Sequence, residues 1–324
     1  MPYQAIQAQR QQFPKMQYRV KNWREYDRAL QERGSFTLWV TPAALASWHP
    51  APTGQRGRAR RYSDLAIETG HLLRLAFGRP WRQTEGLLRS VVTLLGVSLE
   101  VPDHTTFSRR SVDLSLPTAL MRNTEPVHVV IDSTGLKVYG AGEWQAERHG
   151  ERGRRTWRKL HLAVNSESGS ILASELTTHE VGDLAMVGPL LDQIPGSLAS
   201  VTADGAYDAE PVYRAVAERQ PQPPAAVIIP PRATAVLSAT TNIAPSLRDR
   251  HIQLRQEKGR RGWEKAVSYG KRSLVETAMF RYKVLIGPTL RARKFEAQQV
   301  EARMACAVIN RMTQLGMPSS ARVR

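Results

Sequence analysis

The segment Val127-His-Val-Val-Ile-Asp-Ser-Thr-Gly135 begins the part of the chain that decides the fold. Its first five residues are β-branched apart from one histidine, which is typical of a buried strand. We expect the strand to end at Asp132, the first residue of Asp132-Ser-Thr-Gly135. Ligands of α/β sheets gather at the carboxyl ends of strands. Asp132 is therefore the first candidate site residue.

Alternating and helical patterns continue after this strand. Together they give three strands, a helix, a strand, a helix, a strand and a closing helix. The later strands are predicted at Trp157–Val164, Ile171–Thr177, Ser200–Ala203 and Ala225–Ile229, and the two internal helices at Asp183–Ile194 and Asp208–Glu218. This order predicts an α/β fold whose catalytic domain, residues 123–324, is a mixed sheet of the ribonuclease H type. Asp204 follows the fourth strand, and Asp208 is expected to cap the helix after it.

The closing helix is predicted at Tyr269–Lys283. Four of its polar residues recur at helical spacing and fall within an arc of roughly 60° at about 100° per residue. They are Tyr269, Arg272, Glu276 and Lys283. Val267, Leu274 and Phe280 lie on other faces, where we expect them to hold the helix against a core. A solvated face with ordinary ion pairs is the alternative interpretation of this polar stripe.

Three acids could act together if the first and fourth strands are neighbours. Asp132 and Asp204 would then lie side by side, with Glu276 on the closing helix, and Gly135 and Gly205 would leave room for a substrate backbone. Adjacent carboxylates repel one another, and oxygen-only ligands favour Mg²⁺ or Mn²⁺ over zinc. Two such ions suit in-line phosphoryl transfer. The acids are therefore candidate metal ligands.

The overall charge indicates a polyanionic partner. The 324 residues include 46 Lys and Arg against 29 Asp and Glu, which gives a net charge of +17. Nucleic acid fits this charge better than a membrane does, because no basic amphipathic surface helix stands out. No apolar run approaches the length of a membrane span either. A single cysteine, Cys306, excludes an internal disulfide, fits a reducing cytoplasm and is expected in the core.

The N-terminal part is basic and mainly helical. Residues 1–61 contain one helix-like stretch within Tyr18–Arg33 and a strand candidate at Phe36–Val40. Residues 62–122 show three short helices, the third capped by Asp103. These could form a helix-turn-helix-like DNA-binding unit, although the connection from Gly96 to Pro102 is long for one. A plain helical support layer is an equally good interpretation.

Two further basic segments are candidate DNA contacts. The loop before the second strand carries Arg154, Arg155, Arg158 and Lys159, with Trp144 and Trp157 nearby. Phosphate contact is expected there, and a solvated basic hairpin is the alternative. Residues 232–262 lack clean periodicity and are interpreted as a basic loop or insertion, either facing DNA or solvated.

The remaining polar candidates have structural interpretations. His161 follows the strand alternation and is expected in the sheet. Glu175 and Glu180 are interpreted as surface residues.

The ordered motifs resemble those of DDE transposases of bacterial insertion sequences. The resemblance is to the group marked by Tyr-x2-Arg-x3-Glu-x6-Lys, complete here from Tyr269 to Lys283. The two aspartate motifs of the family match Asp132-Ser-Thr-Gly135 and Asp204-Gly-Ala-Tyr-Asp208. Trp157–Leu162 and Pro102–Arg110 also match, so the resemblance spans most of the chain.

The resemblance implies a specific activity. Such enzymes bind terminal inverted repeats as double-stranded DNA, nick them to free a 3′-OH, and join that end to target DNA with two divalent metals. Asp132, Asp204 and Glu276 would be the metal-holding triad, while Tyr269, Arg272 and Lys283 would contact the transposon end. A homo-oligomeric synaptic complex on the bacterial nucleoid is also implied. A metal-dependent nuclease on the same fold and a domesticated non-catalytic DNA-binding protein stay open as alternatives.

Overall fold

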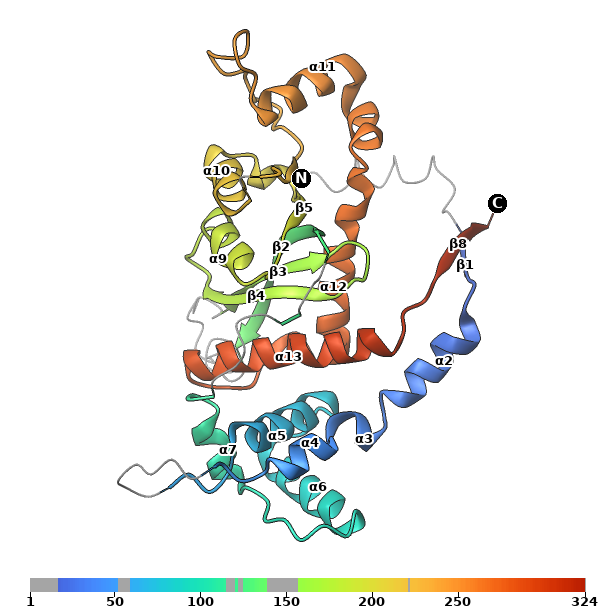
Figure 1. Ribbon diagram of the computed structural model, residues 1–324, viewed down its shortest axis with the longest axis vertical. Coiled ribbons are helices and arrows are strands. Elements are labelled where there is room, and N and C mark those ends of the chain that lie inside the picture. The colour runs from blue at the N-terminus through green and yellow to red at the C-terminus, as the bar shows by residue number, and fades with distance from the viewer. Residues whose placement is uncertain are drawn as a thin grey trace, which may run out of the picture. The chain divides into compact units, whose positions relative to one another are not determined.

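A mixed sheet forms the centre of the catalytic part, with strand order β4-β3-β2-β5-β6 (Figure 1). The computed structural model describes residues 17–51, 59–114, 120–121, 125–138, 157–220 and 222–323. The strands are β2 (Val127–Val138), β3 (Trp157–Asn165), β4 (Ile171–Thr178), β5 (Leu198–Thr202) and β6 (Ala226–Ile228), and β7 (Thr289–Leu290) also pairs with β2. β3 is antiparallel to β2 and β4, whereas β5 and β7 are parallel to β2, and β6 is parallel to β5. This arrangement confirms the predicted ribonuclease H-like α/β fold.

The first strand is longer than the sequence suggested. The predicted end of this strand at Asp132 is wrong, because β2 stays paired with β3 as far as Lys137, opposite Trp157. Pairing with β5, however, ends earlier, at Val130 opposite Thr202. Asp132 therefore lies within a strand and just beyond the end of β5, which leaves that edge of β2 open beside it.

Helices cover the two faces of the sheet (Figure 1). α9 (Val187–Asp192), which follows the 3₁₀ turn η1 (Asp183–Met186), packs on β3 and β4 and against α10 (Glu210–Arg219). α12 (Ser273–Leu285) packs on β2 and β3. Val127, Val129 and Ile131 belong to the apolar cluster formed with α9 and α10. Because side chains alternate along a strand, Asp132 points to the α12 face.

Two predictions about the segment after β5 are wrong. Asp208 does not cap α10, whose N-cap is Ala209. Of the two interpretations of residues 232–262, the loop is wrong and the insertion stays a prediction, because the segment contains most of α11 (Leu247–Ala266). The first turn of α11 is closed by a capping box of Ser246 and Asp249. Asp249 is buried and accepts hydrogen bonds from the backbone and hydroxyl groups of Ser238 and Ser246.

The three predicted helices of residues 62–122 are confirmed. They are α5 (Asp64–Ala76), α6 (Trp81–Leu94) and α7 (His104–Arg110). Asp103 caps α7 as expected, accepting from the backbone N–H of Thr106 at 2.7 Å. α5 and α6 both end before a glycine in the left-handed region, Gly78 and Gly96. By contrast, the strand predicted at Phe36–Val40 is wrong, because Phe36–Trp39 forms a short helix, α3, followed by α4 (Pro42–Ala46).

The chain divides into two compact units. Residues 39–310 form the first unit, which contains the sheet. It begins at the last residue of α3 and ends within α13 (Phe295–Leu315). In the other, β1 (Gln17–Val20) pairs with β8 (Ser320–Val323), and α2 (Trp23–Glu32) follows β1. Cys306 is buried in α13, as predicted. Among the described helices, none combines the length and the apolar character needed to cross a membrane.

Candidate active site

One guanidinium group joins the three predicted acids. Arg272 ends the 3₁₀ turn η3 (Tyr269–Arg272) that leads into α12. Its Nη2 lies 3.1 Å from Oδ2 of Asp132 and 3.9 Å from Oδ2 of Asp204, and its Nη1 donates to Oε1 of Glu276. The three carboxylates from β2, from the end of β5 and from α12 therefore converge on a single cationic group.

Local structure explains this convergence. β5 ends at Thr202, and Asp204 caps the following 3₁₀ turn by accepting from the backbone N–H of Ala206 at 2.8 Å. The buried face of α12 consists of Val275, Ala278, Met279 and Tyr282. Packing this face on β2 turns Glu276 towards the two aspartates. The prediction that Phe280 packs into the core is wrong, since 67% of its surface is exposed.

The three carboxylates differ in their access to water. The side chain of Asp132 is 17% exposed, whereas those of Asp204 and Glu276 are 36% and 55% exposed. Burial raises the pKa of Asp132 above its usual value, against the opposing effects of the Ser133 backbone N–H and Arg272. Asp204 and Glu276 add to the rise because like charges disfavour ionisation. The site therefore carries negative charge that needs a cation.

The donor set suits a hard divalent ion. All three acids offer carboxylate oxygens only, which is the ligand type of Mg²⁺ and Mn²⁺. Among the described residues, however, no three acids, histidines or cysteines are yet close enough together to hold a metal ion. The Arg272 guanidinium lies between these carboxylates, so an ion could be held only after this group has moved aside. The oxygen ligands of the three acids suit a divalent metal ion, and the Arg272 guanidinium lies where such an ion would be held.

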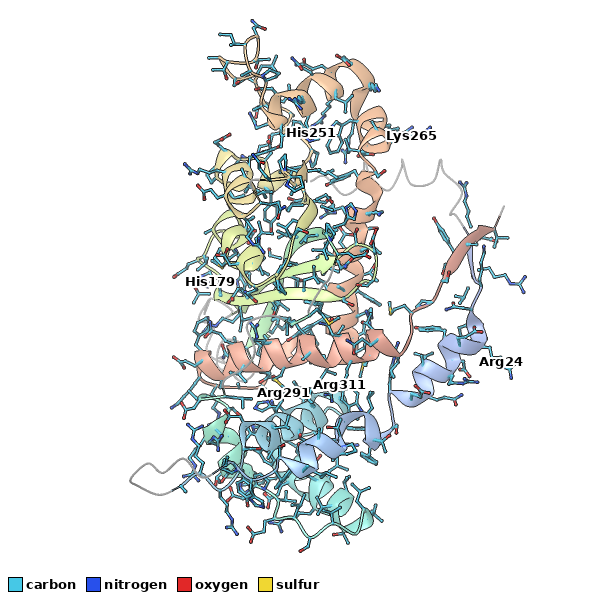
Figure 2. All side chains as sticks on the ribbon, in the orientation of Figure 1. Arg24, His179, His251, Lys265, Arg291 and Arg311 are labelled. Atoms are coloured by element: carbon cyan, nitrogen blue, oxygen red, sulfur yellow. The ribbon has the colours of Figure 1, made fainter. Side chains whose placement is uncertain are left out.

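An open cleft of about 660 Å³ lies beside Arg272, and Glu264 is the acid in its described lining. Tyr269, Lys271 and Arg272 of η3 line it together with Arg261 and Lys265 of α11, the latter labelled in Figure 2. Arg261 and Lys265 were not singled out from the sequence as site residues, although they lie in or just after the basic stretch 232–262. The cleft is rich in cations, which suits a phosphate backbone.

Tyr269 is held in the cleft by its neighbours. Its ring lies 5.2 Å from that of the buried Trp263, centroid to centroid. Burial raises the pKa of Tyr269 to about 12, so the phenol keeps its proton at neutral pH and can donate a hydrogen bond. Ser268 precedes it with φ of 55°, in the left-handed region that non-glycine residues rarely adopt. This backbone conformation at Ser268 turns the chain between the end of α11 and the start of η3.

The structure also places Lys283 and the two described basic residues of β3. Lys283 lies in the last turn of α12, seven residues beyond Glu276. Arg158 donates to the side chain of Gln298 at 3.1 Å, and Lys159 lies 3.2 Å from Asp183 and donates to the carbonyl of Val181. Both β3 cations thus have partners within the protein.

Arg154, Arg155 and Trp144 lie outside the described residues. The expectation that this basic loop contacts phosphate therefore stays a prediction.

Two further residues shape the site: Tyr207, to which the sequence gave no role, and Asp208, which was expected only to cap a helix. Tyr207 is buried, and this burial is the main reason why the pKa of its hydroxyl is raised. The negative charges of Asp132, Asp183 and Asp204 raise the pKa further, because the hydroxyl lies near these acids. Asp208 is also buried and forms a two-point ion pair with Arg248, at 2.7 and 3.0 Å. This pair ties α11 to the end of β5. Both Tyr207 and Asp208 belong to the second aspartate motif, and this position was the feature of the sequence that could have identified them as site residues.

The remaining polar candidates have partners other than the three acids among the described residues. His161 is buried in β3 as predicted, its Nε2 lies 2.9 Å from the hydroxyl of Thr177, and burial lowers its pKa to about 4. Glu180 is exposed, as expected. Glu175 is only partly exposed and accepts from the Gln193 side chain at 2.6 Å, so its surface assignment is wrong.

A solved structure of the piggyBac transposase, in a synaptic complex with hairpin DNA, aligns over 87% of this chain and 75% of its own, with 11% identity and a TM-score of 0.40. One family described as "Transposase DDE domain" matches residues 31–141, and another of the same description matches residues 123–311. Since the second match covers more than half of the chain, the protein belongs to the DDE transposase family.

Proposed function

We propose that this transposase mobilises a bacterial insertion sequence of the group marked by Tyr-x2-Arg-x3-Glu-x6-Lys. It would bind the terminal inverted repeats, cleave them to free 3′-OH ends and join those ends to target DNA. The observation that carries the proposal is the contact of one guanidinium with Asp132, Asp204 and Glu276. Three acids from distant parts of the chain gather around a positive charge at an open surface, as a phosphoryl-transfer site requires.

Each acid has a defined part in this proposal. Asp132, Asp204 and Glu276 would hold two Mg²⁺ or Mn²⁺ ions, which activate an attacking hydroxyl and stabilise a leaving 3′ oxygen when bound. Arg272 would leave the carboxylates and bind the scissile phosphate, for which its fork of N–H donors is well suited. Tyr269, which keeps its proton, would donate to a neighbouring phosphate oxygen.

The proposed DNA path follows the cleft and α12. Lys283 lies on the same face of α12 as Glu276 and about 10 Å further along it, at 1.5 Å per residue. That separation corresponds to about three nucleotides of one strand. Arg154, Arg155, Arg158 and Lys159 would extend the contact, with the two described side chains exchanging protein partners for phosphates.

The proposal includes an assembly. Holding two element ends together requires at least two catalytic sites, so we expect a homo-oligomeric synaptic complex on the nucleoid in the cytoplasm. A metal-dependent nuclease would use the same acids without joining strands. A domesticated DNA-binding protein would not need the acids, and their convergence argues against it.

A strand-transfer assay tests the proposed function. A labelled duplex carrying the terminal repeat of the source element is incubated with Mg²⁺ or Mn²⁺ and a plasmid target. Wild-type protein should give metal-dependent joined products, and Asp132→Ala should give none. Cleavage without joining would establish the nuclease instead. Binding without either reaction would refute the proposed chemistry.

Glu276→Gln separates a catalytic role from a structural one. The change removes a negative charge but keeps the side-chain size, so cleavage should be lost while binding of the duplex stays within about twofold of the wild type. Glu180→Gln is the matched control, because Glu180 is an exposed carboxylate of the same domain. A large loss of both cleavage and binding in Glu276→Gln would argue that Glu276 supports the fold.

A further inference from the structure

A second cationic pocket lies between the helical region and the start of α13. It has a volume of about 610 Å³ and is bounded by α5, the start of α6, the end of α7 and the connection from β7 to α13. Figure 2 labels Arg291 beside α13, at this connection. Its charged lining includes Arg74, Arg109, Arg291, Arg293, Lys294 and Glu301. The described acids in the lining are Glu301 and Asp113, against five cations, which leaves a net charge of +3.

The pocket is separate from the three acids. Leu290 pairs with Val138 near the end of β2, and Arg291 follows directly. Asp132 lies six residues earlier on that strand, which corresponds to about 20 Å at 3.3 Å per residue. A ligand in this pocket would therefore not touch the candidate catalytic centre.

Arg74 is a buried cation with incomplete compensation. Its side chain is 5% exposed, and its Nη1 lies 3.5 Å from Oε2 of Glu301, beyond normal hydrogen-bond length. Its Nε has no hydrogen-bond partner among the described residues. Burial lowers the pKa of Arg74, which reflects the cost of removing its charge from water. Arg74 therefore places a buried positive charge in the lining of the pocket.

Glu301 forms an ion pair with Arg74 and also holds the backbone beside the pocket. Its two carboxylate oxygens accept from the backbone N–H groups of Arg291 and Ala292, at 2.9 and 2.8 Å. These bonds use the carboxylate to fix the β7–α13 connection, which in turn positions Arg291, Arg293 and Lys294 at the pocket. Trp81 lies under the Arg74 guanidinium, 4.6 Å from its ring centroid, and keeps the group in place.

A second buried group in the lining also has an unused atom. His71 is 1% exposed, its Nε2 lies 2.9 Å from the hydroxyl of Ser111, and its Nδ1 has no partner among the described residues. Burial lowers the pKa of His71 to about 3, so the ring is neutral at pH 7. It can then give or accept a single hydrogen bond without adding charge.

We propose that this pocket binds a phosphate group, with Arg74 at its base and Arg109, Arg291, Arg293 and Lys294 around it. Planar guanidinium groups bind phosphate oxygens in pairs, and several of them converge here. The phosphate belongs either to a DNA backbone or to a free nucleotide, which the volume accommodates. The proposal goes beyond the strand-transfer function and does not depend on it.

Binding measurements on the full-length protein test the pocket. Isothermal titration is carried out with inorganic phosphate, with ATP and with a 20-base-pair duplex, at constant ionic strength set by chloride. The test variant is Arg109→Ala with Arg293→Ala, because both side chains are exposed and their loss should not prevent folding. The matched control is Arg214→Ala, an exposed arginine of α10 outside the pocket.

The results separate the two sources of phosphate. A Kd for ATP or phosphate that rises at least tenfold in the double variant, with DNA affinity equal to that of Arg214→Ala, identifies a free ligand. A selective loss of duplex affinity, with no saturable binding of ATP or phosphate to the wild type, identifies a DNA phosphate. Equal affinities of the double variant and Arg214→Ala for all three probes would overturn the proposal. Asp132→Ala should bind each probe like the wild type, whatever its strand-transfer activity.

Discussion

Replacing Arg272 by alanine should tighten Mn²⁺ binding to the DNA-free protein while it abolishes DNA cleavage. The tighter binding follows because the ion and the guanidinium compete for the same three carboxylates. The bond to Asp132, the least exposed of the acids, is a charge-assisted hydrogen bond of the kind that contributes about 1.5–3 kcal/mol. The contacts with the more exposed Asp204 and Glu276 are screened by water and add less than about 1 kcal/mol.

This free energy sets the size of the effect. Since 1.4 kcal/mol corresponds to a factor of ten, the Kd for Mn²⁺ should fall by about 10- to 150-fold in Arg272→Ala. The measurement is a calorimetric titration with MnCl₂ at pH 7.5 in the absence of DNA. Lys271→Ala is the control, because it removes an exposed positive charge that forms no ion pair with the three acids in the described structure. An unchanged or higher Kd in Arg272→Ala would refute competition between guanidinium and metal.

Two predictions concern stability. In Gly70→Ala the new methyl group would lie about 2.1 Å from the ring of Phe107, so the free energy of unfolding measured by chemical denaturation should fall by about 1–3 kcal/mol or more. Gly86→Ala is the control: its methyl group has open space in α6, and the free energy of unfolding should rise by about 0.5–1 kcal/mol. Equal effects of the two changes would contradict the packing of α5 on α7. Burial lowers the pKa of His71 to about 3 and that of His161 to about 4. Below pH 6.5 these two histidines are therefore protonated in the unfolded chain but not in the folded one. As the pH falls from 6.5 to 4, the free energy of unfolding should decrease by up to about 1.4 kcal/mol per pH unit for each histidine. Urea unfolding at several pH values measures this slope, and His161→Gln should make it shallower; a slope identical to that of the wild type would exclude His161 as a contributor.

The sheet and the three acids were predictable because the relevant signals are local. Runs of β-branched residues defined β2 and β6, and the spacing of polar residues along α12 identified Glu276. The long pairing of β2 with β3 beyond Asp132 was not predictable, because the polar residues Ser133 and Thr134 resemble a turn until a partner strand lies beside them. The contact between Arg272 and Asp132 joins residues 140 positions apart and has no local signal.

α11 was missed for a different reason. Its buried side chains are Asp249, Ile252 and Trp263. Only five of its twenty residues are apolar, and their spacing gives little helical periodicity. Gly259, with φ of 65°, interrupts the helix and breaks what periodicity there is. The helix is held instead by polar contacts, namely the Asp249 capping box and the ion pair between Arg248 and Asp208. Contacts of this kind depend on tertiary structure, so an apolar pattern cannot reveal them.

The geometry of η3 aligns Tyr269 with Arg272 more closely than a continuous α-helix would. In an α-helix, Tyr269 and Arg272 would be separated by about 60° around the axis, whereas residues three apart are eclipsed in a 3₁₀ turn. The observed 3₁₀ turn therefore stacks Tyr269 directly before Arg272 on one side of the chain. The α-helix then begins at Ser273, and the four-residue step from Arg272 to Glu276 keeps both on that side. The change from 3₁₀ to α geometry thus aligns the phenol, the guanidinium and the carboxylate towards Asp132 of β2 and the end of β5, which is where a scissile phosphate would have to lie.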